Sequence, residues 1–329
     1  MKPIAHIVFE RIPAPPYLVG LLTSLVFFVG YFAFAMETGL VAQTIKGEVS
    51  SINIRATLTL MVLIGYLPCA HWYLRRWTLM RMQQLQKQFE LPKAVQVISS
   101  VRLLTGGGLG LIAFVAMFLV IPGENAAYLH PWLWSLDYAV VAIAISCVGW
   151  WAGVFSIELI WSALLLTAMA NRLPALNLFD TEANKPFVQQ GVQSALLIVI
   201  MMSITGNIAV QPEGGFIGSI LVSTTMLMLA LVALVLPVRG IHRKIQNQKR
   251  KELFEIRRLL QFENQKRKAE GRVIDGEILG LLAIEARIES VPEWPFDMGS
   301  LSRVILYLLL GLGSWVGAAL VERLLENAW

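Results

Sequence analysis

Seven long stretches of this chain contain no Asp, Glu, Lys or Arg, and this feature constrains the fold more than any other. A helix needs roughly 20 apolar residues to cross a hydrocarbon layer about 30 Å thick. The stretches lack the strict alternation of lipid-facing barrel strands. We therefore expect helices, in which each backbone N–H and C=O group finds a partner within its own segment. The expected spans cover about residues 17–36, 56–74, 103–123, 138–157, 187–210, 215–237 and 304–321.

Composition supports this interpretation and excludes several others. Charged residues make up 15% of the chain and apolar ones 56%, against roughly 25% and 45–50% in soluble proteins. The mean hydropathy of +0.63 is too high for a disordered chain. Two cysteines are too few for a disulfide scaffold or a four-cysteine zinc site. The expected fold class is all-α, a polytopic transmembrane helical bundle of about seven spans.

The basic residues fall mainly on one side once seven spans are threaded through a membrane. Alternate connectors then place 24 of the 27 Lys and Arg residues together, and the positive-inside rule assigns that side to the cytoplasm. We expect a multi-pass protein of the cell (inner) membrane, with the N-terminus cytoplasmic and the C-terminus outside. The net charge of +5 then faces anionic lipid headgroups and is no sign of a nucleic-acid partner.

The first stretch also resembles a signal peptide in outline. Lys2 and Arg11 precede an apolar run that ends in Ala33-Phe34-Ala35, a sequence that signal peptidase can accept. Both the run and the segment before it are long for a cleaved signal. This length favours a retained membrane anchor.

The connector before the last span is large enough to form a module of its own. Residues 241–268 predict a long, very polar helix, and residues 275–290 predict a second, more apolar one. We expect a six-span bundle at 1–238, a basic cytoplasmic helical pair at 239–300, and a seventh span with a short external tail at 301–329. The pair is a solvated hairpin, a contact with anionic lipid, or a docking site for a protein partner or a second copy.

Basic side chains on the first helix of this pair are the candidates for contact with anionic headgroups. Each Lys or Arg near such a surface contributes on the order of 1 kcal/mol. A merely solvated helix would carry the same residues. The candidates are Arg243, Lys244, Lys249, Arg250, Lys251, Arg257 and Arg258.

Glu158 interrupts the longest apolar run, because thirteen more uncharged residues follow it. One helix through this run would be longer than the hydrocarbon layer is thick. Either the helix emerges and Glu158 is a structural residue at the inner boundary, or Glu158 lies within the membrane and is a functional candidate. Arg172 and the basic second connector, residues 75–102, are its expected ion-pair partners.

Four amide side chains of the fifth span are further candidates. In a transporter or channel they would line a shared cavity together with Glu158. More often such amides form hydrogen bonds between membrane helices. The four are Gln189, Gln190, Gln193 and Asn207.

No catalytic constellation is evident. The four histidines lack the spacing of a helical zinc site, and no nucleophile elbow is present. Gly106 and Gly110 fit close helix packing better than a phosphate loop, since no Lys-Ser/Thr pair follows them. We therefore expect no catalytic residue, metal or cofactor, and an enzyme is disfavoured.

The leading hypothesis is a membrane-embedded binding, sensory or accessory component. The alternative is a small-solute or ion transporter or channel that uses polar groups on the fourth and fifth spans.

Overall fold

Helices account for all of the regular structure among the described residues. The computed structural model describes residues 11–12, 14–46, 51–90, 99–120, 136–173, 178, 184–209, 216–270, 276–296, 299, 302–309, 311 and 313. The labelled helices are α2 (Pro16–Glu37), α3 (Leu40–Ile45), α4 (Ser51–Gln88), α5 (Ser100–Val120), α6 (Leu136–Arg172), α7 (Lys185–Ala209), α8 (Phe216–Glu270) and α9 (Gly276–Glu289).

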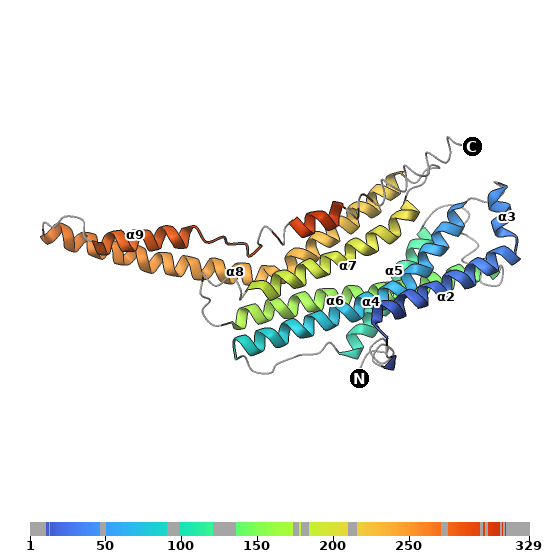
Figure 1. Cartoon of the computed structure of the whole chain (residues 1–329), viewed down its shortest axis with the longest axis horizontal. Helices are drawn as coiled ribbons and strands as arrows, with labels where there is room; N and C mark the ends of the chain where they lie inside the picture. The colour runs from blue at the N-terminus through green and yellow to red at the C-terminus, as the bar shows by residue number, and fades with distance from the viewer. Residues whose placement is uncertain are drawn as a thin grey trace.

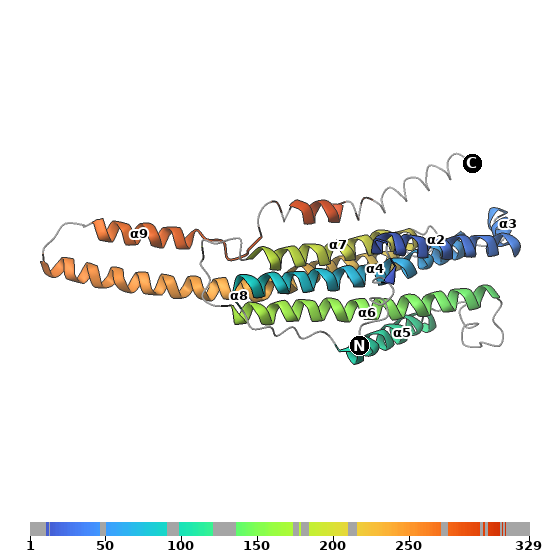
Figure 2. The same cartoon turned by 60° about the horizontal axis from the view of Figure 1, so that its bottom comes forward.

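Four helices lie side by side and form the body of the molecule (Figure 1). Helix α4 contacts α6 and α7, and α8 contacts the same two helices. Helix α2 packs against α4 and α5 packs against α6 at the periphery (Figure 2). In α4 and α7, 61% and 67% of the most apolar window is buried, compared with 17% in α2, so α4 and α7 are central.

Among the described residues, four helices are long and apolar enough to cross a membrane. This fits the prediction of a helical membrane protein and leaves the predicted count of seven spans unconfirmed. The other three predicted spans fall on α5, α8 and the residues after 301, parts of which lie outside the described residues. The four candidate spans are Pro16–Glu37, Ala56–Gln88, Ala139–Arg172 and Lys185–Thr205.

Three helices extend beyond the apolar stretches from which we predicted the spans. Helix α4 continues from residue 74 to Gln88, α6 continues through Glu158 to Arg172, and α8 joins the sixth predicted span to the first helix of the predicted pair. Neither Gly nor Pro occurs at residues 75–88 or 158–172, so nothing ends those helices where the apolar composition ends. At 1.5 Å per residue, the 37 residues of α6 measure about 55 Å.

Helices α5 and α6 cross at glycines. A Cβ atom on Gly110 would lie 2.6 Å from the Cα atom of Gly153, and one on Gly153 would lie 2.8 Å from the Cα atom of Gly110. Backbone atoms cannot move aside as a flexible side chain can. The two helices therefore approach this closely only because these positions carry no side chain, as the Gly106/Gly110 spacing predicts.

The second half of α8 extends beyond the bundle with α9 alongside it, and we call residues 246–270 together with α9 the arm (Figures 1 and 2). Arg257 donates from Nε to Glu285 and from Nη2 to Glu289, both at 2.6 Å. The Nζ atom of Lys249 donates to the carbonyl oxygens of Glu289 and Val291. These contacts fasten α9 and the chain after it to α8.

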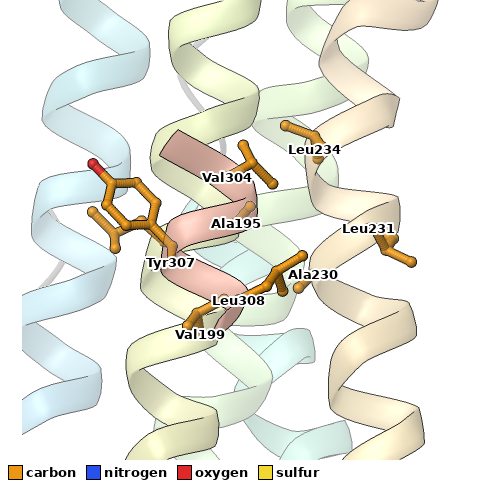
Figure 3. Close-up of a pocket in the computed structure, with 9 residues that line it drawn as sticks. Ala195, Val199, Ala230, Leu231, Leu234, Val304, Tyr307 and Leu308 are labelled. Carbon is orange, nitrogen blue, oxygen red and sulfur yellow. The ribbon is translucent and has the colours of Figure 1, made fainter. Parts of the chain in front are cut away.

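After the arm, the described residues 302–309 return to the bundle and pack against α7 and α8. A narrow apolar crevice without room for a water molecule remains between them (Figure 3). Its labelled lining residues are Ala195, Val199, Ala230, Leu231, Leu234, Val304, Tyr307 and Leu308.

Candidate functional site

Polar side chains separate two apolar clusters in the core of the bundle. One cluster includes Leu67 and Ile198, and the other, nearer the arm, includes Met82 and Phe187. The side chains between them come from α4, α6 and α7 and are buried or half-buried. We call this set the polar belt: His71, Arg75, Thr78, Arg81, Glu158, Ser162, Gln190, Gln193 and Ser194.

Helical spacing explains how three helices contribute to one belt. His71 and Arg75 are four residues apart on α4, as are Glu158 and Ser162 on α6. Residues four apart lie on one face of a helix. Each pair therefore presents two polar groups to the neighbouring helix, while the apolar residues above and below them on the same face form the two clusters.

Glu158 lies at the contact between α4 and α6 and is 4% exposed. Its Oε2 atom is 3.6 Å from Nε2 of His71 and 3.7 Å from Nη1 of Arg75. Both distances are within ion-pair range but longer than a hydrogen bond. We call these three residues the ionic cluster. A carboxylate among apolar side chains needs such a cation, because burying an unpaired charge costs several kcal/mol.

His71 is the member of the ionic cluster that sequence reasoning missed. Its side chain is fully buried, and its ring lies 6.2 Å from the ring of Trp151 on α6. From the sequence alone, we considered the four histidines only as ligands of a helical zinc site. The signal that could have identified His71 is its four-residue spacing from Arg75, the first residue of the basic connector in which we expected a partner for Glu158. Arg172, the other expected partner, is exposed.

The amides of α7 make separate contacts with α4. Gln190 donates from Nε2 to Oγ1 of Thr78 at 2.9 Å. The Oε1 atom of Gln193 accepts a hydrogen bond from Nη2 of Arg81 at 3.0 Å. Gln189 is exposed and does not join them, and the side chain of Asn207 lies outside the described residues. The structure thus brings Glu158, Gln190 and Gln193 to one helix, through different partners.

A large groove lies between α2, α4 and α7, with a volume of about 710 Å³ and almost entirely apolar walls. None of the polar-belt residues lines it. Its lining residues are Tyr17, Gly20, Leu21, Ser24, Leu25, Phe28, Val62, Gly65, Tyr66, Cys69, Ala70, Tyr73, Trp77, Leu196, Leu197, Ile200 and Ile204.

The seven basic candidates on α8 fall into two groups. Lys244 donates to the carbonyl oxygen of Leu173 at the end of α6, and Lys249 and Arg257 hold α9 as described above. These three side chains bind other parts of the protein. The sequence could not predict these contacts, because it does not show which elements pack against α8. The remaining four are exposed: Arg243, Arg250, Lys251 and Arg258.

Within the part of the chain that the structure describes, no three His, Cys, Asp or Glu side chains gather as a metal ion would require. Comparison with protein families, curated proteins and solved structures returned no match for this chain. A functional assignment must therefore rest on the geometry of the polar belt and the groove.

Proposed function

We propose that this chain is a membrane-embedded sensory or binding component whose ionic cluster takes up and releases a proton. One observation carries the proposal: Glu158 is buried against His71 and Arg75, between two helices long enough to span a membrane. Ionisable groups inside membrane bundles are expensive and commonly serve proton or ion pathways. Histidine is the side chain best suited to exchanging protons near neutral pH.

The charges of the polar belt indicate how protonation would change the contact between α4 and α6. With His71 neutral, the charges of Arg75 and Glu158 cancel. A proton added to Glu158 removes the carboxylate that attracts Arg75. The charge of Arg75 is then uncompensated in a buried place, on the helix that also carries Arg81. The α7 members of the belt are uncharged. We therefore expect protonation to weaken the contact between α4 and α6, which gives the cluster a route to signal a change in pH.

Infrared difference spectroscopy tests this proposal directly. The full chain is placed in lipid nanodiscs, and spectra at successively lower pH are subtracted. Other acidic side chains also give a carboxylic acid C=O band as the pH falls. One component of this band should be present in the wild type and absent from Glu158→Gln. Glu277→Gln, an exposed carboxylate at the start of α9, is the control and should retain that component. No Glu158-dependent band over the pH range in which the protein stays folded would rule the proposal out.

A second candidate function is transport of a small solute or ion. The observation in its favour is that polar groups of three helices gather between the two apolar clusters of the bundle. In proteoliposomes with an imposed pH gradient, a proton-dependent flux should be lost in Glu158→Gln and kept in Gln189→Ala, whose side chain is exposed. A flux that is unchanged in Glu158→Gln would eliminate this candidate.

We also propose the seven-span topology in the cell membrane, with a cytoplasmic arm and N-terminus and an external C-terminus. The distribution of Lys and Arg supports it. The course of the helices supports it too, because α4, α6 and α8 run toward the arm whereas α7 runs away from it (Figures 1 and 2).

Contact with anionic headgroups is proposed only near Arg243, where α8 leaves the bundle just before the arm. Helix α8 leaves the bundle without a break, so Arg258 lies about 22 Å farther along it than Arg243 at 1.5 Å per residue. The Debye length at physiological ionic strength is about 8 Å. A membrane surface that attracts Arg243 therefore exerts little force on Arg258. The distal arm is better placed to meet a protein partner than lipid.

A further inference from the structure

The groove between α2, α4 and α7 is built from three helices that can span a membrane, so hydrocarbon surrounds it. Two hydroxyl groups on its walls are engaged within the protein, because Ser24 donates to the carbonyl oxygen of Val62 and Tyr66 donates to that of Leu197. Its volume of about 710 Å³ falls in the range of small-molecule sites, roughly 300–1,000 Å³. These walls suit an apolar chain.

A buried cation lies one helical turn beyond the groove, on the side toward the arm. Trp77 lines the groove, and Arg81 follows it by four residues on the same face of α4. Leu197 lines the groove on α7, and Gln193 precedes it by four residues. The hydrogen bond from Arg81 to Gln193 therefore bridges the same two helices that form the groove.

The charge of Arg81 is not matched by an acid. Arg81 is 8% exposed, and its Nε atom is buried without a hydrogen-bond partner. In the described part of the chain, no acidic group forms an ion pair with Arg81. A buried unpaired cation is costly, so an anion beside it would be strongly favoured. Tyr17, Tyr73 and Trp77 line the same part of the groove, and such rings prefer the depth of lipid headgroups.

We propose that this is a site for one anionic phospholipid, with an acyl chain in the groove and the headgroup phosphate at Arg81. Guanidinium groups are well suited to phosphate because they offer two parallel N–H donors. The Nε atom of Arg81 is buried without a hydrogen-bond partner, and its Nη2 atom is already oriented by Gln193. A phosphate oxygen that reaches Nε would give this donor the partner it lacks. The site is independent of the ionic cluster, and its test does not depend on the proposed proton binding.

Native mass spectrometry of the full chain tests the headgroup contact. The protein is released from micelles that contain equal amounts of phosphatidylglycerol and phosphatidylcholine. The wild type should retain phosphatidylglycerol about tenfold more often, because the choline ammonium of phosphatidylcholine offsets the phosphate charge that attracts Arg81 and the glycerol of phosphatidylglycerol does not. Arg81→Gln should lower this ratio to about one. Arg76→Gln, which removes an exposed cation of the same helix, should keep the wild-type ratio.

A second pair of variants tests the groove without disturbing a buried residue. Leu21 lines the groove and Leu22 does not, and both side chains are exposed on α2. Leu21→Trp should fill the groove and reduce retention of both lipids several-fold. Leu22→Trp should leave retention unchanged. Both variants should fold, because neither position is part of the core.

Three results would overturn the proposal. The first is an undiminished preference for phosphatidylglycerol in Arg81→Gln. The second is unchanged lipid retention in Leu21→Trp. The third is displacement of the lipid by millimolar inorganic phosphate in the micelle buffer, which would assign the cation to a free anion rather than to a headgroup.

Discussion

Glu158 is accommodated within an apolar bundle because a cation lies on the facing helix. Arg75 is 7% exposed, and its Nη1 atom lies 3.7 Å from the Glu158 carboxylate. The pair is neutral as a unit, so removing one member leaves a buried charge without compensation. The two residues should therefore behave as an energetic unit in unfolding experiments.

Arg75→Gln should lower the free energy of unfolding by about 3 kcal/mol or more, because it strands the buried carboxylate. The double variant with Glu158→Gln should recover part of that loss. Unfolding by denaturant in mixed micelles measures both. Arg76→Gln, an exposed neighbour that lies over the Trp72 ring, serves as the control and should change the free energy by no more than about 1 kcal/mol. Additive losses in the double variant would show that the pair does not interact.

Sequence reasoning identified some of these residues and missed others for a physical reason. Glu158 was singled out because charge is rare in an apolar run. Gln190 and Gln193 were named, and hydrogen bonding between helices was the interpretation favoured for them. His71 and Arg81 were not named as site residues, because their partners lie on α6 and α7, far away in the sequence. A contact between helices cannot be obtained from one helix alone.

At the scale of the elements, α5 and α6 depend on backbone contact where they cross. Gly110 should not tolerate a larger residue, because its neighbours there are backbone atoms of α6. Nothing lies within 4 Å of a Cβ atom placed on Gly108 of the same helix. The two glycines therefore form a matched pair that separates crowding from the general cost of changing a glycine in a helix.

Gly110→Leu should move α5 away from α6. It should lower the free energy of unfolding by about 1–3 kcal/mol, the usual cost of overpacking. Gly108→Leu should have little effect. Thermal unfolding and disulfide cross-linking between introduced cysteines on α5 and α6 report the two effects. Equal destabilisation by both variants would contradict the proposed crossing.

The arm should depend on Arg257 rather than on its neighbour. The hydrogen bond from Arg257 to Glu285 raises the pKa of this guanidinium above its ordinary value. A raised pKa stabilises the folded arm below the ordinary pKa of arginine, and this contribution is lost only as pH rises through the raised value. The docking of α9 should therefore not vary through loss of the Arg257 charge near neutral pH.

Arg257→Gln should increase hydrogen exchange at the amides of α9, whereas Arg258→Gln, an exposed control, should not. Exchange measured by mass spectrometry at two pH values above neutrality checks both the contact and its insensitivity to pH. Protection of α9 that is unchanged in Arg257→Gln would mean that apolar packing alone holds it.

The extent of the helices was only partly predictable. Apolar runs located the cores of α2, α4, α6 and α7, because hydrophobicity determines which residues can lie in lipid. The run through Glu158 already allowed one helix to residue 171, as α6 has it, but no run could show that α8 is one helix through residue 240. Helix ends depend on breakers and caps, and polar residues such as those at 75–88 continue a helix as readily as apolar ones.

At the scale of the whole molecule, the proposed topology has seven helices that cross a bilayer. An odd number of spans places the two termini in different compartments. Cysteines added at each end of a Cys147→Ser background should react differently with an impermeant maleimide on intact cells, because Cys147 is the exposed native thiol. Only the C-terminal cysteine should be labelled. Equal labelling of both termini would refute the seven-span topology.

The most direct test of the central claim is the distance between α4 and α6 as a function of pH. Spin labels at Gln84→Cys and Asn171→Cys lie on exposed positions near the arm ends of these helices. Measured by pulsed electron resonance in nanodiscs, the distance distribution should shift as the pH falls in the wild-type cluster and stay fixed in Glu158→Gln. A distribution that does not respond to pH, or the same shift in Glu158→Gln, would contradict a proton-sensing role for the ionic cluster.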